Sequence, residues 1–141
     1  MTASVLASIL ALALAAQSEE DEPAARPPVP IVYGGAGYQA AFDRAQRYER
    51  DNTVNDWRNR EFGPAVNGQI TAIFQTCVGP RTARPGAPFV VVLSFAPDGA
   101  ADGAFVDVRT PQSQCMAARL VDLRAPRPPV RDFAEEIRVE P

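Results

Sequence analysis

Histidine and lysine are both missing from this chain, and cysteine occurs only twice. Without histidine the chain has no Ser-His-Asp or Cys-His catalytic pair, no histidine metal ligand and no histidine pH switch. All 14 basic residues are therefore arginines, and they are interleaved with acidic residues at a net charge of −3. No basic stripe is present for a phosphate backbone, so we expect no nucleic-acid partner. The composition predicts a protein that is not an enzyme and that holds no metal and no cofactor.

The longest apolar run extends from Val5 to Ala16 and is followed by an acidic cluster. As a helix this run would cover roughly 18 Å, which is too short for a hydrocarbon core of about 30 Å. Ala13 and Ala15 give an A-x-A-like cleavage site. We therefore predict a signal peptide over residues 1–16, no membrane span after its cleavage, and a periplasmic or secreted protein. A short uncleaved membrane anchor is the alternative, because no Lys or Arg precedes the run.

The rest of the N-terminal half divides into three segments. Residues 17–37 are acidic and then Pro-rich, so we expect a flexible tether. Residues 38–62 predict an N-terminal helix as far as about Arg50, followed by a polar connector. Gly63-Pro64 predicts the start of a second helix, with proline at its first position, and Gly79-Pro80 predicts its end. Its apolar stripe consists of Val66, Ile70, Ile73, Phe74 and Cys77.

The C-terminal half predicts strands and one further helix. Phe89 to Phe95 is a β-branched and aromatic run typical of a buried strand, and a turn and a second strand at 104–108 follow it. Thr110-Pro111 predicts a helix to about Leu123, and a last strand at 133–139 follows. The order of elements predicts an α+β fold: a small antiparallel sheet of about three strands with two to three helices packed on it.

Cys77 ends one predicted helix and Cys115 lies near the start of another. In an exported chain, the only two cysteines are expected to form a disulfide, which would close the fold. A redox-active pair is the alternative, but such pairs have C-x-x-C spacing. We therefore predict a structural disulfide.

The expected domain at 63–141 resembles, over about residues 63–139, the TonB-like C-terminal domain of exported and envelope proteins. The likeness lies in the order of its elements: the helix to Cys77, the Val-rich strand, the turn Pro97-Asp98-Gly99, the strand to Val108, the helix with Cys115, and the Pro-rich approach to a final strand. The resemblance implies a non-enzymatic domain that binds a protein or peptide of the cell envelope by adding a strand to a sheet edge. Energy-transducing members have a transmembrane anchor and a long Pro-rich spacer, and this chain has only a short export segment and a brief tether.

The predicted partner-binding edge is the last strand. Phe133, Glu135, Ile137 and Val139 would share one face of this strand, because side chains alternate along it. The alternative function is a small secreted inhibitor or an accessory subunit of an envelope complex, in which loops would contact the partner. The sequence identifies neither the partner nor the oligomeric state.

Three other groups of residues have simpler interpretations than a functional site. The aspartates at 98, 102 and 107 lack the spacing of a calcium-binding loop, so we interpret them as turn residues. Glu135 and Glu136 are neighbours on a strand and point to opposite faces, which predicts solvated charges and not an acid–base pair. Trp57, with Arg58 and Arg60, is interpreted as a lid over the core instead of an exposed recognition patch.

Overall fold

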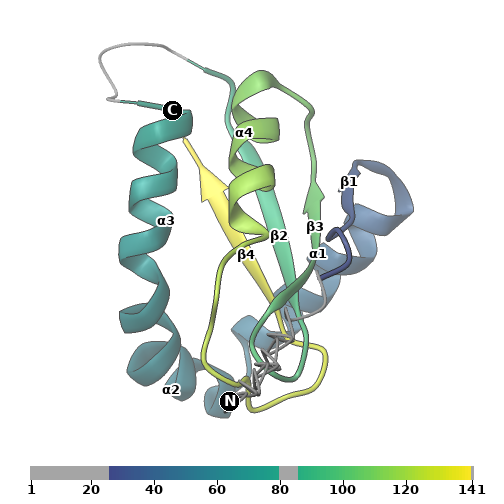
Figure 1. Cartoon of the computed structure of the whole chain (residues 1–141). Coiled ribbons are helices and arrows are strands. Elements are labelled where there is room, and N and C mark those ends of the chain that lie inside the picture. Colours follow the sequence, from purple (N-terminus) through teal and green to yellow (C-terminus); the bar gives the residue numbers. More distant parts are fainter. Residues whose placement is uncertain (1–25, 80–85, 141) are drawn as a thin grey trace, which may run out of the picture.

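The computed structural model describes residues 26–79 and 86–140. The strands are β1 (Ile31–Tyr33), β2 (Phe89–Phe95), β3 (Ala101–Val106) and β4 (Ala134–Val139). The helices are α1 (Gly35–Glu49), α2 (Asn52–Trp57), η1 (Arg58–Phe62), α3 (Gly63–Cys77) and α4 (Pro111–Leu120). The predicted α+β class is confirmed, and the strand predicted at 89–95 has the predicted bounds (Figure 1).

The sheet has four strands in the order β1-β3-β2-β4, one more than expected. It is mixed and not antiparallel, because β1 pairs with β3 in parallel. The additional strand lies in the segment expected to be a flexible tether: β1 begins at Ile31 and α1 follows at Gly35. The prediction missed β1 because a strand of three residues next to prolines gives almost no periodic signal.

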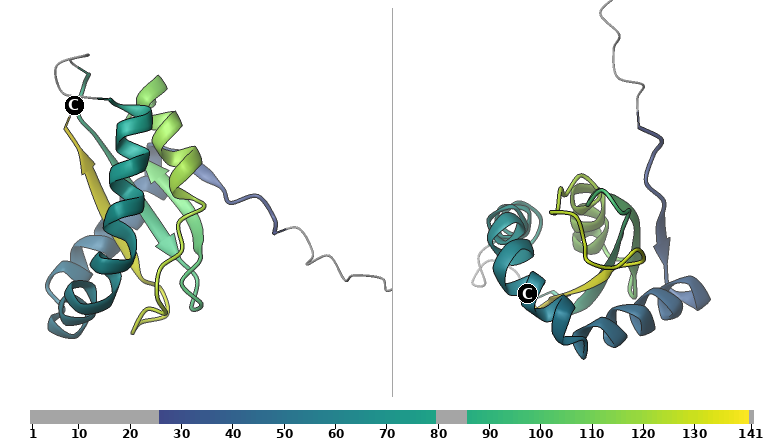
Figure 2. Two further views of the ribbon diagram at one scale, coloured as in Figure 1. Left: turned by 60° about the vertical axis from the view of Figure 1, so that its left-hand side comes forward. Right: turned by 90° about the horizontal axis from the view of Figure 1, so that it is seen from below.

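Helices cover both faces of the sheet (Figure 2). The larger core lies under α3 and α4, where Met116 and Leu120 pack with Val91 and Leu93 of β2. On the opposite face, α1 packs on the sheet through small residues. β2 is therefore covered from both sides, which explains its nearly continuous apolar sequence.

The chain passes from one face of the sheet to the other through a single bent helical segment. Asp51 caps this segment, with its carboxylate accepting hydrogen bonds from the N–H groups of Thr53 and Val54. From Asn52 to Cys77 the elements α2, η1 and α3 follow without a non-helical residue. The predicted start of the second helix is confirmed, because α3 begins at Gly63 and has Pro64 in its first turn, but η1 leads into it without the expected break.

The π-helical turn η1 has a local cause. Pro64 has no N–H and its ring crowds the carbonyl four residues earlier, so a regular α-helix cannot pass through this position. The backbone widens instead, and the Gly63 N–H donates to the carbonyl of Arg58, five residues earlier. A Cβ atom at Gly63 would lie 3.2 Å from that carbonyl oxygen, so glycine fits the widened turn.

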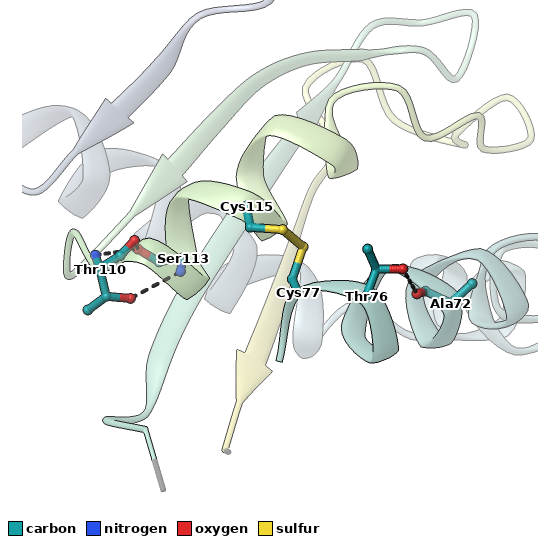
Figure 3. Close-up of a disulfide and its surroundings, with 6 residues drawn as sticks. All are labelled: Ala72, Thr76, Cys77, Thr110, Ser113 and Cys115. Carbon is teal, nitrogen blue, oxygen red and sulfur yellow. Dashed lines mark hydrogen bonds between the residues drawn. A yellow bond between two sulfur atoms is a disulfide. The ribbon is translucent and has the colours of Figure 1, made fainter. Parts of the chain in front are cut away.

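The predicted disulfide between Cys77 and Cys115 is confirmed, and it joins the last residue of α3 to α4 (Figure 3). The Cα atoms are 5.5 Å apart. Thr110 and Ser113 start α4 with a reciprocal capping box, in which each side-chain oxygen accepts from the other residue's backbone N–H. The bond therefore fixes the C-terminal end of α3 to a well-defined helix on the sheet.

The predicted signal peptide and residues 17–25 of the predicted tether lie outside the described residues. Within the part that the structure describes, no helix combines the length and the apolar character that are needed to cross a membrane.

Replacement of both cysteines, as Cys77→Ser with Cys115→Ser, should lower the free energy of unfolding by about 4 kcal/mol, the chain-entropy value for a loop of this size. The sequence separation of the bonded cysteines is 38. Urea denaturation of the two proteins measures the difference, and the wild type under a reductant should unfold like the double variant. Equal stability with and without the bond would contradict a structural role.

Candidate functional site

The two edges of the sheet differ. At one edge, β1 has only three residues, and Pro27, Pro28 and Pro30 precede it. The Pro30 carbonyl accepts from the N–H of Ala104 at 3.0 Å, so Pro30 faces β3. Proline has no N–H to donate, so the ladder with β3 does not extend before β1. The β1 edge is therefore short.

At the other edge, β4 pairs with β2 along its whole length, from Ala134 opposite Ser94 to Val139 opposite Phe89. Just before β4, the Phe133 carbonyl accepts from the N–H of Phe95. In an antiparallel ladder, residues that bond to the partner alternate with residues that point away from it. The odd-numbered residues of β4 therefore bond to β2, and the even-numbered residues direct their N–H and C=O groups to the open edge.

These outward-facing residues are Ala134, Glu136 and Arg138. No other backbone group in the described part of the chain is hydrogen-bonded to them. Ala134 is fully buried, so the start of the edge is covered. The Arg138 side chain is 64% exposed, so the edge becomes accessible toward its C-terminal end.

A groove of about 560 Å³ lies along this edge. Its main contributors are η1 and the first turns of α3 on one side and β4 on the other, and we call it the β4 groove. Its lining residues are Arg58, Asn59, Phe62, Gly63, Pro64, Asn67, Ile70, Glu135, Glu136 and Ile137. The groove exists because α3 packs mainly against α4 and η1 and not against β4. Figure 1 shows α3 beside β4, on the side away from β2.

An aromatic cluster fixes the closed end of the β4 groove. Phe133 lies between Trp57 and Phe95, with ring centroids 5.0 Å and 5.6 Å away, and Phe62 packs on all three rings. Trp57 is only 7% exposed, so it belongs to the core and not to a surface patch. Arg60 pairs with Asp56 in solvent. This cluster holds η1 against the start of β4.

An ion pair spans the groove next to this cluster. Arg58 donates from Nε and Nη2 to Oε2 of Glu135, each at 2.9 Å, and the two side chains are 19% and 18% exposed. Burial raises the pKa of Glu135 above its ordinary value, and the Arg58 charge and hydrogen bond offset part of this rise. Glu49 and Glu136 add smaller repulsions that raise the pKa of Glu135 further. The β4 groove thus holds a buried carboxylate, Glu135, whose charged form is stabilised by Arg58.

Glu136 points to the opposite face, where it accepts a hydrogen bond from Gln46 of α1 and pairs with Arg138. The predicted separation of Glu135 and Glu136 by the pleat of the strand is therefore confirmed. The prediction that both are solvated charges is wrong, because the Glu136 side chain is only 3% exposed and Glu135 is largely buried. Packing of helices on both faces of β4 buries both carboxylates.

The structure divides the four residues predicted for partner binding. Glu135 and Ile137 line the β4 groove, whereas Phe133 and Val139 are buried in the core. Phe133 also precedes β4, which begins at Ala134. The sequence analysis missed the helical wall of the groove, above all Ile70 and Asn67. Ile70 belonged to the apolar stripe of its predicted helix and Asn67 lay outside that stripe, so neither position indicated that it faces a strand edge.

The three aspartates considered as metal ligands have separate structural contacts. Asp98 accepts from the N–H of Ala100 in the hairpin turn, and Asp102 accepts from the Ser94 hydroxyl. Asp107 accepts from two backbone N–H groups. Among the described residues no group of three or more Cys, Asp or Glu is placed to hold a metal ion.

Comparison with known proteins returns no relative. The chain matches no family model, no curated protein and no solved structure. The resemblance to the TonB-like C-terminal domain therefore rests on the order and spacing of the elements in this chain.

The raised pKa of Glu135 predicts a pH effect of defined sign. Between the ordinary glutamate pKa of about 4.3 and the raised pKa of Glu135 in the folded state, the folded protein retains a proton that the unfolded chain has released. The stability that Glu135 contributes therefore falls as the pH rises through its folded-state pKa. Relative to Glu135→Gln, the wild type should lose free energy of unfolding over this range. Urea denaturation of both proteins across a pH series tests this, and a difference that stays constant or grows with pH would contradict it.

Proposed function

We propose that this protein is a non-enzymatic binding module of the cell envelope, which captures an extended segment of a protein or peptide by strand addition at β4. The observation that carries the proposal is the row of outward-facing backbone groups at Glu136 and Arg138 beside the β4 groove. Unpaired N–H and C=O groups on an exposed strand are a template for another strand. In such complexes backbone hydrogen bonds supply affinity, and neighbouring pockets supply selectivity.

The contrast between the two sheet edges supports this assignment. The β1 edge is only three residues long, and a very short edge strand is a common protection against unwanted pairing. The β4 edge has six residues, contains no proline, and has a groove beside it. The π-helical turn η1 forms part of the groove wall, and π-helical turns are frequent at functional sites. These features favour β4 as the edge that receives a partner.

Binding also fits the chemistry of the groove better than catalysis does. Its lining includes no Ser, Thr, Cys, Tyr or Lys, so these described residues offer no hydroxyl, thiol or amine nucleophile. Its buried carboxylate, Glu135, is engaged by Arg58. Export, as expected from residues 1–16, would place the module in the periplasm or outside the cell, where its disulfide is stable.

Replacement of Arg138 by proline tests strand addition. The Arg138 N–H points to the open edge, so Arg138→Pro removes an outward donor and leaves the ladder with β2 intact. Proline at Ile137 would be less informative, because that N–H belongs to the pair with Val91. We expect Arg138→Pro to abolish capture of envelope polypeptides by the immobilised domain.

Arg138→Ala is the matched control, since it also removes the pair with Glu136 but retains the backbone N–H. Circular dichroism and urea denaturation check that both variants fold. Capture should persist with Arg138→Ala. If Arg138→Pro captures the same polypeptides as the wild type, the edge is not used, and a loop-mediated inhibitor or accessory subunit becomes the better description.

A further inference from the structure

We propose that the β4 groove selects segments that place an aliphatic side chain opposite Ile137, where it would pack between Ile137 and Ile70 of α3. This inference rests on the proposed function and adds the chemical class of segment that the site accepts. Three properties of the described structure lead to it: the register of the edge, the polarity of the groove walls, and the closed end of the groove.

The register determines where each side chain of an added strand would point. A segment can hydrogen-bond to β4 only through Glu136 and Arg138, because these are the accessible residues with outward backbone groups. The residue between the two bonded positions then lies opposite Ile137. Residues opposite each other on paired strands share a face of the sheet, so its side chain projects to the face of α3. One side chain therefore enters the groove at Ile137, whichever direction the segment runs.

The walls of the groove include two isoleucines, and their charged side chains are paired. Ile70 and Ile137 are both partly buried against the main core, and both line the groove. α3 has no charged residue from Gly63 to Cys77. The three charged residues of the lining are already paired, Arg58 with Glu135 and Glu136 with Arg138. A charged side chain opposite Ile137 would thus lose water without gaining a counter-charge, whereas an aliphatic one would cover two isoleucines.

The closed end limits where the segment can lie. Ala134 is fully buried, and the Arg58–Glu135 pair spans the groove immediately after it. Pairing that extends toward Ala134 is blocked, so a segment is confined to the region from Glu136 to the C-terminal end of β4. Because the segment bonds only at Glu136 and Arg138, its central residue lies opposite Ile137. The groove selects the segment by the side chain of that central residue.

Two capped peptides that differ only at the centre test the proposal: acetyl-Thr-Thr-Ile-Thr-Thr-amide and its analogue with Asp in place of Ile. Each reads the same in both directions apart from backbone polarity, so the direction of pairing does not affect the comparison. Titration into the ¹⁵N-labelled protein, monitored at the amides of Glu136 and Arg138, gives the affinities. We expect the isoleucine peptide to bind at least about tenfold more tightly, as expected for burial of one aliphatic side chain.

Ile70→Asn should reduce this preference to less than about threefold, because the added amide replaces the apolar wall. Gln69→Asn is the matched control, since Gln69 is exposed on the neighbouring position of α3 and its replacement should leave the preference unchanged. The comparison of the two peptides on the wild type does not depend on whether Ile70→Asn folds.

Each outcome separates the inference from the proposed function. Equal affinity of the two peptides, with shifts at Glu136 and Arg138, would overturn the selectivity and leave strand addition standing. If neither peptide shifts these amides, both the selectivity and the proposed function fail. Concentration-dependent shifts of the same amides without peptide would show a second copy of the chain at the edge, and this result also contradicts the proposal.

Discussion

Attachment of α3 at its two ends is the constraint on which the candidate site depends. At one end the aromatic cluster around Phe62 and Phe133 fixes η1 against the sheet. At the other end the disulfide from Cys77 fixes α3 to α4. Between these points only Val66 is fully buried, so the middle of the helix is not packed closely on β4. The groove is therefore a consequence of how α3 is anchored, and any change that frees either end should alter its width as well as the stability of the fold.

The bend at Pro64 connects this constraint to the electrostatics of the groove. Because the helix widens at η1, the chain changes direction as it passes around the start of β4, and Arg58 lies within reach of Glu135. The ion pair has a cost, since burial disfavours the charge on Glu135 and the arginine offsets only part of it. A buried pair of this kind is weak evidence for stability. The Arg58–Glu135 pair lies at the closed end of the β4 groove. Its simpler explanation is therefore that it sets where the groove ends.

Sequence reasoning succeeded where a signal is local and strong. The β-branched run predicted the bounds of β2, and the two lone cysteines, together with the predicted signal peptide, predicted the disulfide. It failed where the deciding interaction is distant in sequence. Three residues at Ile31–Tyr33 become a strand only because β3 offers a partner edge, and the polar connector expected before Gly63 is helical where Trp57 and Phe62 pack into the core. Of the candidate site, the strand could be predicted, but the opposing wall could not, because the offset of α3 from β4 arises from tertiary packing alone.

An exposed strand edge can bind a partner, but it can also pair unspecifically with other chains. The two edges of this sheet are limited in different ways, which supports a different role for each. The β1 edge is only three residues long, and Ala134 at the start of β4 is buried against Ala41 and Ala45 of α1. What stays open is a short stretch with charged residues at 136, 138 and 140, and charges on an edge discourage unspecific pairing. Closer packing of α3 on β4 would have covered this stretch of the edge as well, because α3 already runs beside it. The anchoring of α3 leaves accessible a short section of edge whose backbone groups lie next to an apolar wall, which is the combination that strand addition with side-chain selection requires.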